Sequence, residues 1–212
     1  MAMMTKRYVF SKAAMCIEEN FKLEGFRFIK SNSRILKKYY GGFNLILLHV
    51  LDYSPIFQIE LFLSVRIDIV ENIVNDFIPN RNPQFMKYTE TIGTSYKELS
   101  GAKENLIEIS TEKELDNAIN EFIKIIRDKG LAFFEKYQNI EMVNAEIKKQ
   151  ILNKEYNYIG IIMQSLSLMK LCNDPDFDVL CDKYKELYVP FVGQEITGRK
   201  ALNNLIEYLK AM

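Results

Sequence analysis

Residues 56–67, IFQIELFLSVRI, alternate between apolar and polar side chains, and only Phe62 interrupts the polar set. A period of two places the apolar residues on one face of a strand, whereas a helix would scatter them around its axis. A strand with one apolar face and one mostly polar face is typical of an antiparallel sheet that packs against a core on one side. The apolar set is Phe57, Ile59, Leu61, Leu63, Val65 and Ile67.

Three further strands are predicted before this one, at 26–30, 35–40 and 43–52, separated by short turns rich in serine, glycine or proline. Links this short cannot carry a parallel crossover, so the four strands are expected to form an antiparallel meander. A helix is predicted over about residues 5–23, because its apolar residues recur at helical spacing. Residues 106–109 favour another strand, and 85–101 are poorly patterned.

The second half of the chain is predicted to be helical. Thr111 is followed by Glu114 in the capping-box pattern that opens a helix, and every legible element from residue 131 onward has helical spacing. The predicted fold class is therefore α+β, an antiparallel meander sheet of four to six strands with helices packed on one face. We expect an α+β sheet domain at 1–130 and a helical C-terminal subdomain at 131–212, packed on the first.

Composition restricts the function. The 212 residues include 28 basic and 28 acidic side chains, so no whole-molecule field draws the chain to nucleic acid or anionic lipid. With one histidine, His49, and three cysteines at unpaired spacing, no zinc pattern can be built. The start lacks an apolar segment of signal-peptide length. We expect a soluble cytoplasmic protein without a membrane anchor, metal or cofactor.

No motif identifies a catalytic site or a small-molecule site. His49 lies within an apolar strand, and the three cysteines lie on apolar helix stripes or at a helix end, so all four are interpreted as packing residues. Asp174, Asp176 and Asp178 have the spacing that begins a calcium loop, but the glycine and glutamate that complete it are absent. An enzyme of unrecognised type stays an alternative.

Phe62 suggests a contact surface instead. It stands on the otherwise polar face of the long strand with Glu60 and Arg66 beside it, as the anchor of a contact with another chain would. Helices of the same chain are an alternative cover for this face. We predict Glu60, Phe62 and Arg66 as partner-contact residues.

Basic and aromatic residues between 22 and 40 raise a second possibility. Positive charges interleaved with rings are typical of single-stranded nucleic-acid binders. However, strand alternation separates Arg27 from Phe26 and Phe28, and lysines on outer strands also prevent edge-to-edge aggregation. The candidate nucleic-acid contacts are Arg27, Lys30, Arg34, Lys37 and Tyr39.

The succession of a helix, GFRF, a basic strand, a glycine-ended turn and FQIELFLSVRIDIVENI is similar to an uncharacterised family of bacterial α+β domains. The resemblance covers about residues 8–130 and supplies no catalytic residue. Some such domains look like immunity proteins encoded beside toxins, which implies a protein-binding role. The resulting hypothesis is a non-enzymatic protein-binding domain, acting on a partner protein or as a homodimer, with toxin neutralisation as one version.

Overall fold

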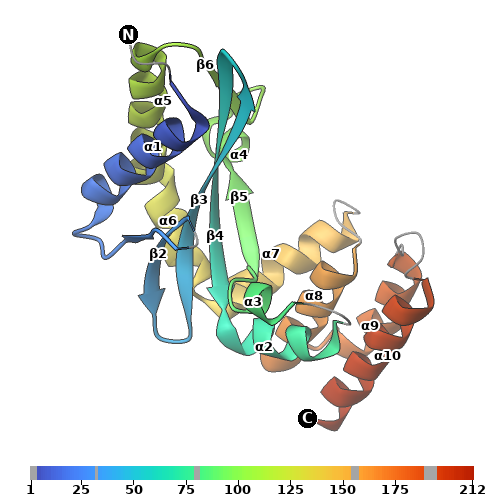
Figure 1. The fold of residues 1–212 in the computed structure, drawn as a ribbon. Coiled ribbons are helices and arrows are strands. Elements are labelled where there is room, and N and C mark those ends of the chain that lie inside the picture. The colour runs from blue at the N-terminus through green and yellow to red at the C-terminus, as the bar shows by residue number, and fades with distance from the viewer. Residues whose placement is uncertain (1–3, 32, 79–81, 154–157, 189–194) are drawn as a thin grey trace. The chain divides into compact units, whose positions relative to one another are not determined.

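The fold is α+β. The computed structural model describes residues 4–31, 33–78, 82–153, 158–188 and 195–212. It contains an antiparallel six-stranded sheet and helices both before and after the sheet (Figure 1). The fold class predicted from the sequence is therefore confirmed.

The sheet begins as the predicted meander. Its strands are β1 (Arg27–Ile29), β2 (Arg34–Tyr39), β3 (Gly42–Tyr53), β4 (Ile56–Ile67), β5 (Ile92–Ser95) and β6 (Leu106–Ile109). The order across the sheet is β1-β2-β3-β4-β5, and β6 also pairs with β4. All six apolar residues of the alternating set in β4 are buried, as a strand with one face on the core requires.

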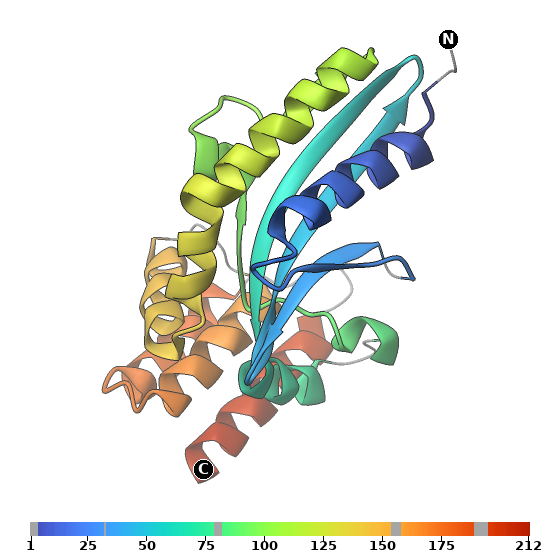
Figure 2. The same cartoon turned by 90° about the vertical axis from the view of Figure 1, so that its left-hand side faces the viewer.

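The contacts divide the chain into two compact units, the first made of residues 1–65 and 93–135. Its helical segments are α1 (Lys6–Phe21), α4 (Tyr96–Ser100), α5 (Glu112–Ile125) and the π-helical turn η1 (Ile126–Gly130). Helices α1 and α5 contact each other and cover one face of the sheet (Figure 2). The capping box predicted for α5 is present, because Thr111 and Glu114 each accept a hydrogen bond from the other's backbone nitrogen.

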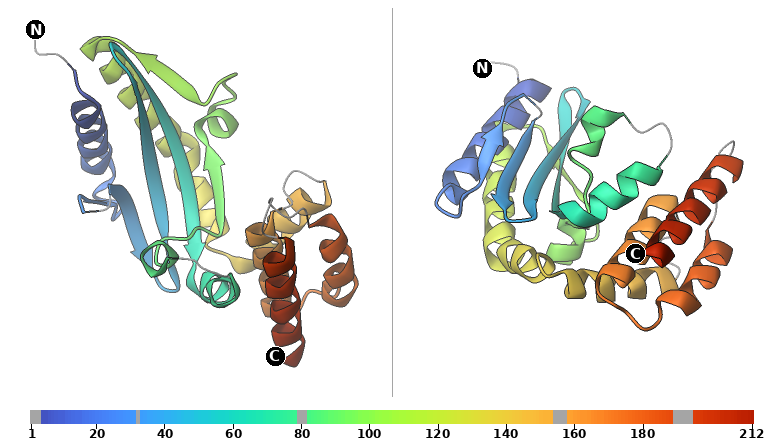
Figure 3. Two further views of the ribbon diagram at one scale, coloured as in Figure 1. Left: turned by 45° about the vertical axis from the view of Figure 1, so that its right-hand side comes forward. Right: turned by 90° about the horizontal axis from the view of Figure 1, so that it is seen from below.

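The second unit comprises residues 66–92 and 136–212. It is built around α8 (Ile159–Leu171), which contacts α2, α7, α9 and α10 (Figure 3). Every residue from Ile161 to Met169 in α8 is buried, so this helix forms the centre of the unit. The surrounding helices are α2 (Asp68–Phe77), α3 (Pro83–Met86), α7 (Ile140–Leu152), α9 (Phe177–Leu187) and α10 (Glu195–Ala211), and α6 (Leu131–Tyr137) spans the boundary at 135.

The segment 66–92 interrupts the sheet unit in sequence and belongs with the C-terminal helices. A buried hydrogen bond of 2.7 Å from Gln164 Nε2 of α8 to Glu71 Oε1 of α2 joins its two pieces. Residues 66–92 were predicted to lie within a domain ending at 130, and the packing of the two domains on each other stays a prediction. The poorly patterned stretch at 85–101 contains the end of α3, β5 and α4.

Candidate functional site

The most exposed apolar side chains of the sheet gather at the tip of the β3–β4 hairpin. Leu51 is 38 % exposed, Tyr53 62 % and Ile56 40 %. Leu51 and Tyr53 follow His49 at alternate positions of β3 and therefore project from the same face as its imidazole. Exposed apolar groups that lie together, rather than scattered singly, are typical of contact surfaces.

His49, Glu60 and Phe62 extend this surface along the two strands. The rings of His49 and Phe62 lie 5.5 Å apart, tilted by 52°, and His49 Nδ1 lies 3.6 Å from Glu60 Oε2. Phe62 is half-buried and the His49 side chain is 58 % exposed. We call the six residues together the hairpin patch, namely His49, Leu51, Tyr53, Ile56, Glu60 and Phe62.

Two of the three predicted partner-contact residues, Glu60 and Phe62, belong to the hairpin patch. Arg66 does not, because its side chain is buried in the second unit. Its guanidinium donates 3.0 Å hydrogen bonds to the carbonyls of Met86 and Thr89 and forms a 2.6 Å ion pair with Asp68. Arg66 thus holds the segment after α3 in place.

The five candidate nucleic-acid contacts do not share one face. Arg27 pairs with Leu36, and Arg34 lies two positions before Leu36, so Arg27 and Arg34 project from the same side. Lys37 and Tyr39 project from the opposite side by the same alternation, and Lys30 follows the end of β1. The Arg27 guanidinium donates 2.7 Å hydrogen bonds to the carbonyls of Lys22 and Phe26. This arrangement lacks the single basic and aromatic surface that single-stranded nucleic-acid binding uses.

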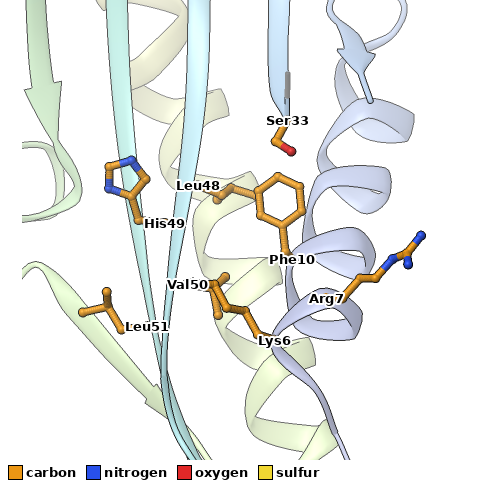
Figure 4. Close-up of a pocket in the computed structure, with 8 residues that line it drawn as sticks. All are labelled: Lys6, Arg7, Phe10, Ser33, Leu48, His49, Val50 and Leu51. Atoms are coloured by element: carbon orange, nitrogen blue, oxygen red, sulfur yellow. The ribbon is translucent and has the colours of Figure 1, made fainter. Parts of the chain in front are cut away.

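A cavity of about 620 Å³ lies on the other face of β3, between that strand and α1. We call it the edge groove; it is lined by Lys6, Arg7, Phe10, Ser33 and residues 48–51. Figure 4 shows Leu48 and Val50 pointing toward Phe10, while His49 and Leu51 project from the opposite side of the strand. The Phe10 ring is supported by the Phe28 ring at 5.9 Å. The groove therefore has an apolar floor and a basic rim.

The rim is positively charged for two reasons. Lys6 and Arg7 occupy the first turn of α1, which holds no acidic residue, and the backbone dipoles add positive potential at a helix N-terminus. One carboxylate feels this charge, because hydrogen bonds from Ser54 and then the charge of Lys6 lower the pKa of Asp52. The groove was not predicted from the sequence, because its residues come from three separate segments of the chain.

Several groups with shifted pKa values lie in the second unit. Burial raises the pKa of Glu71, whose Oε1 accepts hydrogen bonds from Thr91 and Gln164. Burial also raises the pKa of the Cys172 thiol to about 11 and that of Cys181. Thiols with raised pKa values are poor nucleophiles near neutral pH. These groups serve packing and hydrogen bonding within the helical unit.

Within residues 4–31, 33–78, 82–153, 158–188 and 195–212, no group of three or more His, Cys, Asp or Glu side chains could hold a metal ion. In the same ranges, no helix has the length and apolar character needed to cross a membrane. No protein-family model, curated protein or solved structure matches the chain.

Proposed function

We propose that this chain is a non-enzymatic protein-binding domain and that the hairpin patch is its contact surface. The observation that supports the proposal most is the cluster of exposed apolar side chains at the hairpin tip, continuous with the His49–Phe62 ring pair. An aromatic centre beside a charged rim residue such as Glu60 is the usual composition of a protein contact. Toxin neutralisation in the cytoplasm is the specific version of this function that we propose.

The main alternative is an enzyme. Catalysis by side chains needs titratable groups that converge in a cavity with pKa values suited to the reaction. Burial raises the pKa of one carboxyl and two thiols of the second unit, those of Glu71, Cys172 and Cys181. The edge groove is instead lined by two cations, Ser33, His49 and apolar residues. This distribution favours binding over chemistry.

Site-specific cross-linking tests the proposal. A photoreactive benzophenone amino acid placed at Tyr53 is expected to capture one partner in the native host cell. The same group at Phe85, which is 64 % exposed in the second unit, is the matched control and should capture none. Adducts of equal yield from both positions, or from neither, would contradict the proposal.

The identity of the captured chain also distinguishes a homodimer from a complex with a different protein. An adduct of twice the chain's mass, together with a dimeric mass in light scattering, identifies a homodimer. For a purified partner, Phe62→Ser should weaken binding by at least about thirtyfold, the effect of losing a central contact residue of about 2 kcal/mol. If the partner is a toxin encoded beside this gene, the same substitution should abolish protection of co-expressing cells.

A further inference from the structure

Strand β3 is longer than its neighbour β2. The pairing of the two strands runs from Tyr39–Gly42 to Ile35–Ile46, whereas β3 continues to Tyr53. The sheet order places β4 on the other side of β3. In the described part of the chain, residues 47–53 of β3 therefore have no strand beside them on the β2 side. An unpaired edge presents backbone N–H and C=O groups that can pair with an added chain.

The unpaired edge faces the edge groove rather than open solvent. Residues 48–51 form one wall of the cavity, and Lys6, Arg7 and Phe10 of α1 form the other. Ser33, in the turn between β1 and β2, closes one end in line with β2. A groove between a strand edge and a helix is the shape into which recognition domains accept an extended peptide as an extra strand.

The positive charges at the rim of the groove indicate the charge of the segment that would bind there. Lys6 and Arg7 are exposed, and among the described residues neither forms an ion pair with a carboxylate. Tyr8, the next residue of α1, donates a hydrogen bond from its hydroxyl to Glu112 on α5, so this carboxylate is already engaged. The nearby Asp52 is a single negative charge against two positive ones. Opposite potentials across a contact favour association, so the added segment should be acidic.

We propose that the edge groove binds an extended acidic segment of a partner protein, which adds to β3 as an antiparallel or parallel strand. The backbone of the segment pairs with residues 47–53, a length that accommodates about seven residues at ~3.3 Å each. Alternate side chains of the segment pack on Phe10, Leu48 and Val50, and the positive charges of Lys6 and Arg7 attract its carboxylates. A second copy of this chain paired edge to edge would bring two basic rims together, so a different, acidic chain is the occupant.

The edge groove and the hairpin patch share residues 49 and 51 of β3, but the side chains of His49 and Leu51 project from the face opposite Leu48 and Val50 (Figure 4). Strand addition in the groove can therefore be tested independently of the proposed function. One partner that contacted both surfaces would gain affinity from two linked contacts.

The test uses the full chain and three fluorescent eight-residue peptides. The first is four repeats of Glu-Val, the second is four repeats of Lys-Val, and the third is the first with alternate backbone nitrogens methylated. The Glu-Val peptide is expected to bind, and the Lys-Val peptide is expected not to bind. Methylation removes the donors needed for strand pairing but leaves every charge, so the third peptide should bind at least about tenfold more weakly.

Charge-reversal variants locate the site. The double substitution Lys6→Glu and Arg7→Glu should weaken binding of the Glu-Val peptide by about tenfold or more. Lys87→Glu with Lys183→Glu makes the same charge change at exposed positions of the second unit that do not line the groove, and should have a smaller effect. Hydrogen exchange of the amides at residues 48–51 should slow when the peptide binds. Ile56→Ser, which lies on β4 outside residues 47–53 and alters only the hairpin patch, should leave peptide binding intact.

Several outcomes would overturn the proposal. If the methylated peptide bound as tightly as the unmethylated Glu-Val peptide, the peptide would be held by charge and not by strand addition. Binding of dodecanoate in the groove without any peptide binding would assign it to an amphipathic small anion. Absence of binding by all three peptides, or unchanged exchange at residues 48–51, would equally contradict strand addition.

Discussion

Gly130 lies at the end of η1, directly against the core side of β4. A Cβ atom built on Gly130 would lie 2.6 Å from Leu63 Cδ1 and 3.5 Å from two carbons of Ile126. Carbon atoms pack best at about 3.5–4.0 Å, so the first contact is about 1 Å too short. Leu63 is fully buried, and its side chain has no adjacent solvent into which to move. Close packing against Leu63 therefore disfavours a side chain at this position.

The expected effect of Gly130→Ala is the sum of two opposing contributions. Alanine is favoured over glycine by about 1 kcal/mol in a helix interior, whereas overpacking a core costs about 1–3 kcal/mol. We expect a net loss of about 0–2 kcal/mol in the free energy of unfolding. Leu63→Val removes the crowded methyl group, so in that background Gly130→Ala should become neutral or stabilising. The coupling between the two substitutions is expected to be about 1–2 kcal/mol.

Urea unfolding of the four proteins of this double-mutant cycle, followed by far-ultraviolet circular dichroism, measures the coupling. Gly101→Ala is the control, because nothing lies within 4 Å of the added carbon and its cost arises from a backbone φ of +80°. That substitution should not couple to Leu63→Val. Additivity of Gly130→Ala and Leu63→Val within about 0.5 kcal/mol would refute the packing argument.

Three further predictions concern the two faces of β4, the start of α5 and the second unit. Leu61→Ala, at a fully buried position, should lower the free energy of unfolding by about 2–5 kcal/mol, and Phe62→Ala on the half-buried face should cost less than half as much in the same urea titration. Hydrogen bonds from the backbone and hydroxyl of Ser110 and from the backbone of the following residue lower the pKa of Glu114 from 4.5 to about 2. The stability that this carboxylate contributes is fully present above pH 4.5 and is lost as the pH falls toward 2. Unfolding curves of wild type and Glu114→Gln should therefore show a difference in stability that disappears over that interval. Burial favours the protonated form of Asp174, but hydrogen bonds from a lysine, a backbone N–H and an asparagine outweigh this effect and lower its pKa. Asp174→Ala should therefore lower the free energy of unfolding by about 1.5–3 kcal/mol at neutral pH. An unchanged stability in thermal or urea unfolding would contradict this role.

Local patterns were sufficient to predict the elements of the sheet unit. The alternation from Ile56 to Ile67 gives the bounds that β4 has in the structure. The hydroxyl at Thr111 and the carboxylate at Glu114 predicted the start of α5 correctly. Both signals act between residues close in sequence, where backbone geometry alone decides which side chains meet.

Long-range partners were not predictable in the same way. The alternation gave Arg66 a place on the polar face, but its hydrogen-bond acceptors include carbonyls 20 and 23 residues later in the chain. The buried Glu71 accepts a hydrogen bond from Gln164, which lies 93 residues away in the sequence. No local periodicity carries such information.

The candidate sites fall between these two cases. Glu60 and Phe62 were identified from their face of β4, and the contact of Phe62 with His49 follows from two alternating strands joined by a tight turn. One feature of the edge groove was predictable from the sequence. The strand predicted at 43–52 is longer than the one predicted at 35–40, so part of its edge has no partner there. What the sequence could not supply was the position of α1, whose Lys6 and Arg7 form the rim of the groove.

The interleaved order of the two units has a consequence for biosynthesis. All parts of the sheet unit have left the ribosome once residue 135 is outside, but residues 66–92 must then wait for α8 before Glu71 meets Gln164. Because domains fold as their residues emerge, the apolar face of α2 is exposed on the nascent chain throughout this interval. We expect this segment to be a preferred target for chaperones during translation.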